Sequence, residues 1–327
     1  MWLLLATWLV LTGCTSTGST PTRGPTNVAP PTTGAGSQPP SSAPTTTASV
    51  TLGPAEAARL VIRSITCDDV CGPQPGTTIL SDGRVIWQVE GPDGWIMSER
   101  TLTPMGLQIV RDAMAATRLL DIDGSYTPTV RLGMNPPGHG TISHLLRAAS
   151  DDRIVSVSAV DPGTFETDNE VFGDVWDIPA QAYVLSDLAD KLSGPETWLP
   201  ADAWADTRRP YEADAYLLVV GGERTQALPP FVDVDAVRWP FVAPIDRVGQ
   251  PFAEQGVVVQ GTRCLPITRE VAAALAAAEH AIGYERSILA PYTDLPYAWK
   301  RGPGSVSVAL RQLLPDQQVT CVGGGAW

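Results

Sequence analysis

Thr77-Thr78-Ile79-Leu80, Ser81-Asp82-Gly83-Arg84 and Val85-Ile86-Trp87-Gln88-Val89 make up the stretch of sequence that decides the fold. Two short apolar runs flank an Asp-Gly pair, which is the sequence pattern of a tight β-hairpin. A second turn, Gly91-Pro92-Asp93-Gly94, follows at once and leads into another apolar run. Connections this short leave no room for a crossover helix, so consecutive strands must be antiparallel neighbours. The stretch therefore predicts an antiparallel sheet built from hairpins.

Further strands and a few helices are predicted on both sides of this hairpin. Thr103-Pro104 marks one helix start, because Thr caps free N–H groups and Pro is tolerated at the first helical position. After Asp161-Pro162-Gly163 we expect a polar bend. The fold class is therefore α+β, with antiparallel sheets and a few packed helices. The predicted strands are 60–66, 141–147, 153–160, 216–220, 257–260 and 318–322, and the predicted helices are 104–120, 179–192 and 271–282.

Composition divides the chain into an N-terminal apolar run, a spacer and a folded body. Residues 14–50 are Thr, Ser, Pro and Gly with almost nothing else, and such a segment cannot bury enough apolar area to offset its conformational entropy. We expect this segment to be disordered and, because of its prolines, extended. The remainder suits one large or two modest domains. The predicted parts are an α+β subdomain at 51–195 and a smaller α+β subdomain at 196–327.

The apolar run from Trp2 to Leu11 has the length of the core of a secretory signal, and it is too short to cross about 30 Å of hydrocarbon as a helix. It ends in Leu11-Thr12-Gly13-Cys14, which resembles the lipobox of bacterial lipoproteins. The resemblance implies that residues 1–13 are a lipoprotein signal peptide and that the Cys14 thiol carries a diacylglycerol thioether with fatty acids such as palmitate. Several acyl chains hold a protein stably on a membrane, at about 0.8 kcal/mol per buried CH₂. In one respect the run departs from the usual pattern, because no Lys or Arg precedes it.

The lipobox resemblance implies a location outside the cytoplasm, on the cell membrane, with residues 14–50 as a spacer that holds the body away from the surface. The formal net charge of the chain is -13, and residues 1–50 contain a single charged side chain, Arg23. The body is therefore strongly acidic, and it repels phosphate backbones and anionic lipid headgroups. No nucleic-acid partner is expected, and the membrane contact is expected to be through the lipid.

Four cysteines remain when Cys14 carries lipid, namely Cys67, Cys71, Cys264 and Cys321. An even set in an extracytoplasmic protein favours disulfides. Of the three pairings we predict Cys67–Cys71, which closes a tight loop, and Cys264–Cys321, whose members are both expected at strand ends. The rival interpretation is a four-cysteine zinc site, which requires two close cysteine pairs where the chain has one. We therefore expect no metal and no cofactor.

Histidine offers the candidate polar site, at His139 and His144. Five residues apart on a strand, the two side chains lie on opposite faces, so a shared metal is not expected. A Ser/His/Asp site is compatible with either histidine, but the chain has no Gly-x-Ser-x-Gly motif. We therefore expect both histidines to lie on the loop and strand surface. The acidic run at 121–125 lacks the twelfth-position Glu of an EF-hand and predicts a helix-to-strand turn.

Taken together, these features limit the classes of function that the sequence allows. Eight of the ten tryptophans follow the apolar run; we expect most to pack in cores, the alternative being exposed rings that stack on sugars. The sequence predicts a lipid-anchored extracytoplasmic protein that binds or scaffolds an envelope protein or glycan, without catalysis, since no catalytic motif is found. The alternative is an envelope hydrolase acting on cell-wall or glycan material, which requires a cleft where His139 or His144 meets an Asp or Ser. The hairpins argue against a transporter's solute-binding component, because such proteins are usually doubly wound.

Overall fold

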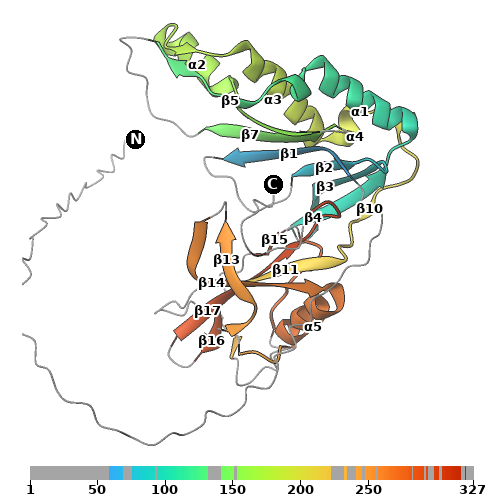
Figure 1. Ribbon diagram of the computed structural model, residues 1–327, viewed down its shortest axis with the longest axis vertical. Coiled ribbons are helices and arrows are strands. Elements are labelled where there is room, and N and C mark those ends of the chain that lie inside the picture. Colours follow the sequence, from blue (N-terminus) through green and yellow to red (C-terminus); the bar gives the residue numbers. More distant parts are fainter. Residues whose placement is uncertain are drawn as a thin grey trace, which may run out of the picture. The chain divides into compact units, whose positions relative to one another are not determined.

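The computed structural model is α+β, as the sequence predicts, with antiparallel sheets and helices packed on them (Figure 1). Residues 1–48 and 49–327 form separate units, and every residue described below belongs to the second. The signal peptide and spacer predicted at 1–13 and 14–50 lie outside the described residues. The structure describes residues 59–68, 76–92, 94–131, 141–150, 153–221, 232–233, 241–244, 247–254, 257–281, 283–290, 292–293, 298–301, 304–317 and 321.

Eight strands of the described residues form the first sheet, in the order β10-β4-β3-β2-β1-β7-β8-β5. The hairpin predicted around Asp82-Gly83 is confirmed: Ile79 pairs with Val85, and Gly83, at φ +90°, donates its N–H to the Leu80 carbonyl. All neighbours are antiparallel except β5 and β8. The bounds are β1 Leu60–Asp68, β2 Thr77–Leu80, β3 Arg84–Gly91, β4 Gly94–Thr101, β5 Gly124–Tyr126, β7 Ile142–Ala149, β8 Ile154–Val160 and β10 Arg209–Pro210.

Helices α1 (Pro104–Ala116) and α3 (Ala180–Ser193) cover one face of the first sheet (Figure 1). The Thr103 hydroxyl accepts a hydrogen bond from the N–H of Gly106 at 3.1 Å, so the predicted helix cap is confirmed. Short helical turns join these elements, and a small sheet pairs β6 with β9. Their bounds are η1 Leu119–Asp121, α4 Pro195–Trp198, η2 Ala201–Ala203, β6 Thr129–Val130 and β9 Trp176–Asp177. The core contains Ile62, Ile79, Val85 and Trp87 from the strands with Val110, Met114, Leu185 and Leu188 from the helices.

Helix α2 (Gly163–Phe172) replaces the polar bend predicted after residues 161–163. The Asp161 side chain accepts a hydrogen bond from the N–H of Gly163 at 2.7 Å, which starts the helix. The Phe165 ring is buried edge-on against Trp176, with centroids 4.9 Å apart. This aromatic contact joins residues eleven apart in the chain, and the polar local sequence gives no signal of it.

The second sheet contains seven strands of the described residues, in the order β12-β16-β17-β11-β14-β13, with β15 paired to β17. Strand β14 continues well past the predicted 257–260, and the β16–β17 hairpin was not predicted. Helix α5 (Arg269–His280) packs on this sheet through Ala272 and Leu275 (Figure 1). Thr268 precedes α5, but its hydroxyl makes no capping hydrogen bond. The strands are β11 Ala215–Val220, β12 Val232–Asp233, β13 Gln250–Glu254, β14 Val257–Thr268, β15 Tyr292–Thr293, β16 Ala298–Arg301 and β17 Gly304–Gln312.

A buried ion pair joins α5 to the segment that follows it. Glu279, which is fully buried, accepts hydrogen bonds from both Nε and Nη2 of Arg286, and the Trp299 indole N–H also donates to it at 3.2 Å. Arg286 donates in addition to the Val308 carbonyl at 3.0 Å. Buried charges are tolerated when paired and fully hydrogen-bonded. These contacts therefore fix α5 against β16 and β17.

The predicted subdomain boundary at 195/196 stays a prediction, although contacts cross it. The carboxylate of Asp206 accepts hydrogen bonds from the N–H and hydroxyl of Thr101, at 2.7 and 2.8 Å. Partial burial raises the pKa of Asp206, but the bonds from Thr101 and the charge of Arg209 outweigh it, so this pKa lies below its usual value. Met97 on β4 donates its N–H to the Leu289 carbonyl at 2.9 Å.

Candidate functional site

Three polar side chains meet around His144 on the helix-covered face of the first sheet. The antiparallel register of β1 and β7 places Thr66 opposite His144, and its hydroxyl lies 3.3 Å from the ring Nδ1. Helix α3 contributes Ser186, whose Oγ lies 3.3 Å from Nε2. Asp161, which follows β8 directly, brings Oδ2 to 3.6 Å from Nε2 and 3.3 Å from the Ser186 hydroxyl.

The proton arrangement of this cluster differs from that of a Ser-His-Asp triad. In a triad the serine and the aspartate occupy different ring nitrogens, and the serine gives its proton to histidine. Here Ser186 and Asp161 both lie at Nε2, and the serine hydroxyl donates to the carboxylate. Since that hydroxyl has a single proton, it cannot donate to Asp161 and to Nε2 at the same time. While Ser186 donates to Asp161, the ring does not accept the serine proton.

Burial also restricts access to the Ser186 hydroxyl, although Thr66 is exposed and Asp161 is partly exposed. His144 is 2% exposed and Ser186 is 5% exposed, so no substrate carbonyl reaches the hydroxyl in this conformation. Within the described residues, no group of three or more His, Cys, Asp or Glu side chains is placed to hold a metal ion. The arrangement can satisfy the hydrogen bonds of a buried imidazole, which would otherwise be costly.

The expectation that His144 lies on the strand surface is wrong, because Thr66, Asp161 and Ser186 supply partners for a buried ring. His139 lies outside the described residues. The three partners were missed by sequence reasoning. One signal was present: Ser186 falls on the apolar stripe of α3 between Ala182 and Ala189, where a polar residue needs a partner.

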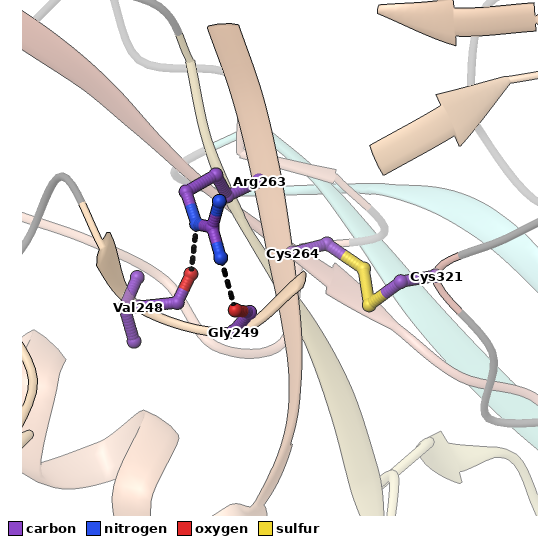
Figure 2. Close-up of a disulfide and its surroundings, with 5 residues drawn as sticks. All are labelled: Val248, Gly249, Arg263, Cys264 and Cys321. Atoms are coloured by element: carbon purple, nitrogen blue, oxygen red, sulfur yellow. Dashed lines mark hydrogen bonds between the residues drawn. A yellow bond between two sulfur atoms is a disulfide. The ribbon is translucent and has the colours of Figure 1, made fainter. Parts of the chain in front are cut away.

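Cys264 and Cys321 are joined by a disulfide, as predicted, with their Cα atoms 5.7 Å apart (Figure 2). Cys264 lies inside β14 rather than at a strand end. Next to it, Arg263 donates to the carbonyls of Val248 and Gly249 at 3.0 and 2.5 Å (Figure 2). Gly249 adopts φ +65°, and a Cβ there would lie 1.9 Å from the Cys264 carbonyl oxygen. Only glycine fits this close approach.

Of the other three cysteines, only Cys67 lies among the described residues. Cys67 on β1 is buried and disulfide-bonded, with its partner outside the described residues. Cys71 and Cys14 lie outside them too, so the Cys67–Cys71 pairing and the lipidation of Cys14 stay predictions. In the part of the chain that the structure describes, no helix combines the length and apolar character needed to span a membrane.

Half of the six tryptophans that the structure describes are buried in cores, and Trp239 and Trp327 lie outside the described residues. Trp87, Trp204 and Trp299 are buried, and the guanidinium of Arg100 lies 4.5 Å from the centre of the Trp204 ring. Trp95 is different: it follows the β3–β4 turn and is 59% exposed. A large exposed ring on a rigid hairpin is a candidate contact for a ligand.

No protein-family model, curated protein or solved structure matched this chain. The candidate sites are therefore interpreted from their own contacts and burial.

We expect Ser186 in the native protein to remain unlabelled by a fluorophosphonate probe, because its hydroxyl is buried and donates to Asp161. Replacing it, Ser186→Ala, should lower the free energy of unfolding by about 1 kcal/mol, since His144 and Asp161 lose a shared partner. Labelling is read by mass spectrometry and stability by urea denaturation. Ser193→Ala, at an exposed site on the same helix, is the control and should change neither. Probe attached to Ser186 would favour the hydrolase alternative.

Loss of the Cys264–Cys321 bond should lower the stability of the body markedly. A disulfide between residues 57 positions apart is expected to contribute about 4 kcal/mol in the chain-entropy description. The double variant Cys264→Ser/Cys321→Ser should therefore unfold at lower urea concentration than the oxidised wild type. With both proteins reduced, the difference should largely disappear. Peptide mapping without reduction that finds these cysteines linked to other partners would contradict the prediction.

Proposed function

We propose that this protein is a lipid-anchored extracytoplasmic protein that binds an envelope glycan or protein without catalysing a reaction. The observation that carries the proposal is the disulfide between Cys264 and Cys321, because such bonds persist in oxidising compartments and are rare in the cytosol. The lipobox-like Leu11-Thr12-Gly13-Cys14 supports the same location. A lipid at Cys14 would attach the chain to the outer face of the cell membrane.

The arrangement around His144 supports a binding role over a hydrolytic one. A nucleophilic serine needs a base that accepts its proton and a substrate that reaches it. Ser186 has its hydroxyl directed to Asp161 and is buried. The contact of a histidine with both a serine and an aspartate is nevertheless the feature named by the hydrolase alternative, so the probe experiment above decides between the two.

Trp95 favours a glycan as the partner. Its ring is exposed, and across the hairpin it pairs with Glu90, which is also exposed. Sugars are bound by an aromatic face that stacks on the ring and by acidic acceptors for the hydroxyl groups. Both groups lie on a hairpin fixed by eight cross-strand pairs from Arg84–Thr101 to Gly91–Gly94, so the pair is presented by a rigid scaffold.

Membrane attachment predicts a simple outcome for Cys14→Ser. The variant cannot form the thioether, so it should fail to incorporate radiolabelled palmitate and should be absent from the lipoprotein fraction extracted by detergent. The unsubstituted chain should be labelled and extracted. Cys71→Ser serves as the control, since it removes a cysteine of the body, and with it the predicted Cys67–Cys71 disulfide, without touching the lipobox. Equal palmitate incorporation in Cys14→Ser would contradict the anchor.

Glycan binding predicts that the body, residues 49–327, sediments with purified cell-wall polysaccharide. Trp95→Ala should reduce the bound fraction at least tenfold, because the stacking surface is lost. Trp204→Phe, which changes a buried ring, is the matched control and should bind as the unsubstituted body does. Equal sedimentation of Trp95→Ala and the unsubstituted body would exclude Trp95 as the contact.

A further inference from the structure

Two arginines lie side by side on the face of the first sheet opposite the helices. Arg63 on β1 and Arg147 on β7 are direct partners in the antiparallel register, so their side chains point to the same face. Their neighbours Ile62 and Leu146 belong to the core beneath the helices. Because side chains alternate along a strand, the two arginines point away from that core.

Arg63 is buried and fully engaged. It is 1% exposed, its Nε donates to the Thr78 hydroxyl at 2.9 Å, and its Nη2 donates to Asp316 at 2.6 Å. Burial lowers the pKa of Arg63; the charge of Asp316 opposes that shift and the charge of Arg147 adds to it. The guanidinium of Arg147 is therefore close enough to repel that of Arg63.

Arg147 differs from Arg63 in its hydrogen bonding and in its exposure. Its Nε is buried and has no hydrogen-bond partner among the described residues, while the residue as a whole is partly exposed. Buried donors in folded proteins are nearly always paired. Within the described residues, the pair of guanidinium groups has one carboxylate, that of Asp316. Among the described side chains, one positive charge is therefore left without a counter-charge, at the partly exposed Arg147.

We propose that Arg147, beside Arg63, forms a binding site for a singly charged oxyanion, either a carboxylate or a phosphodiester group of a ligand. A guanidinium presents parallel N–H donors that match the oxygen spacing of both groups. One negative charge balances the excess positive charge of the pair. The strongly acidic remainder of the body repels anions, so binding depends on this local pair rather than on the overall field. The site does not depend on lipid attachment or on glycan binding at Trp95.

Titration of the purified full chain with acetate or dimethyl phosphate tests the site. Each titration is compared with sodium chloride at equal ionic strength, and binding is followed by thermal shift and by calorimetry. A saturable rise in Tm with at least one of the two oxyanions is expected. Arg147→Met should weaken the apparent affinity at least tenfold, whereas Arg153→Met, at an exposed arginine on the neighbouring strand connection, should leave it unchanged. No saturable rise, or equal binding by Arg147→Met, overturns the proposal.

Stability without the oxyanions gives an independent readout. In chloride buffer alone, Arg147→Met should have a Tm equal to or above that of the wild type, because it removes an unpaired buried donor and the repulsion from Arg63. A lower Tm would show that Arg147 already has a partner within the chain, and it would overturn the proposal.

Discussion

Strand β2 is buried on both faces, and the placement of every neighbouring element depends on that constraint. All four of its residues, Thr77–Leu80, are buried. Ile79 packs into the core beneath α1 and α3, whereas Leu80 joins the core that contains Tyr216, Leu218 and other residues of the second sheet. A strand of four residues cannot be covered on both sides by local sequence alone. Each face of the hairpin therefore requires its own layer, helices on one side and the second sheet's core on the other.

Elements with strong local signals were predictable from the sequence. Asp82-Gly83 specified the first hairpin, and Thr103-Pro104 specified the start of α1; both were found where predicted. Helix α2 was not predictable, because its stability comes from Phe165 packing on Trp176 rather than from an apolar stripe. The β16–β17 hairpin was missed although Ser305-Val306-Ser307-Val308 alternates polar and apolar residues, which is the pattern of a half-buried strand.

The candidate site was predictable only in part, since a sequence does not reveal which distant residues meet. His144 was identified, but its burial depends on Thr66, Asp161 and Ser186, which come from a strand, a turn and a helix. The Cys264–Cys321 pairing was predicted correctly, although the reason given was incomplete, because Cys264 lies within a long strand. Arg63 and Arg147 were not singled out, because neither local sequence indicates a cross-strand pair of like charges.

The disulfide would have a consequence for crowding under the proposed membrane anchor. Among the described strands, β13 is the last of its sheet, and an uncovered outer strand is a template on which a neighbouring molecule can add a strand. Cys321, tethered to β14, places its carbonyl 3.0 Å from the N–H of Ala253 on β13 and occupies one of the free donors of that edge. Molecules tethered in two dimensions meet far more often than molecules free in solution. Cys321, held covalently on this edge, would hinder such encounters from becoming intermolecular sheets.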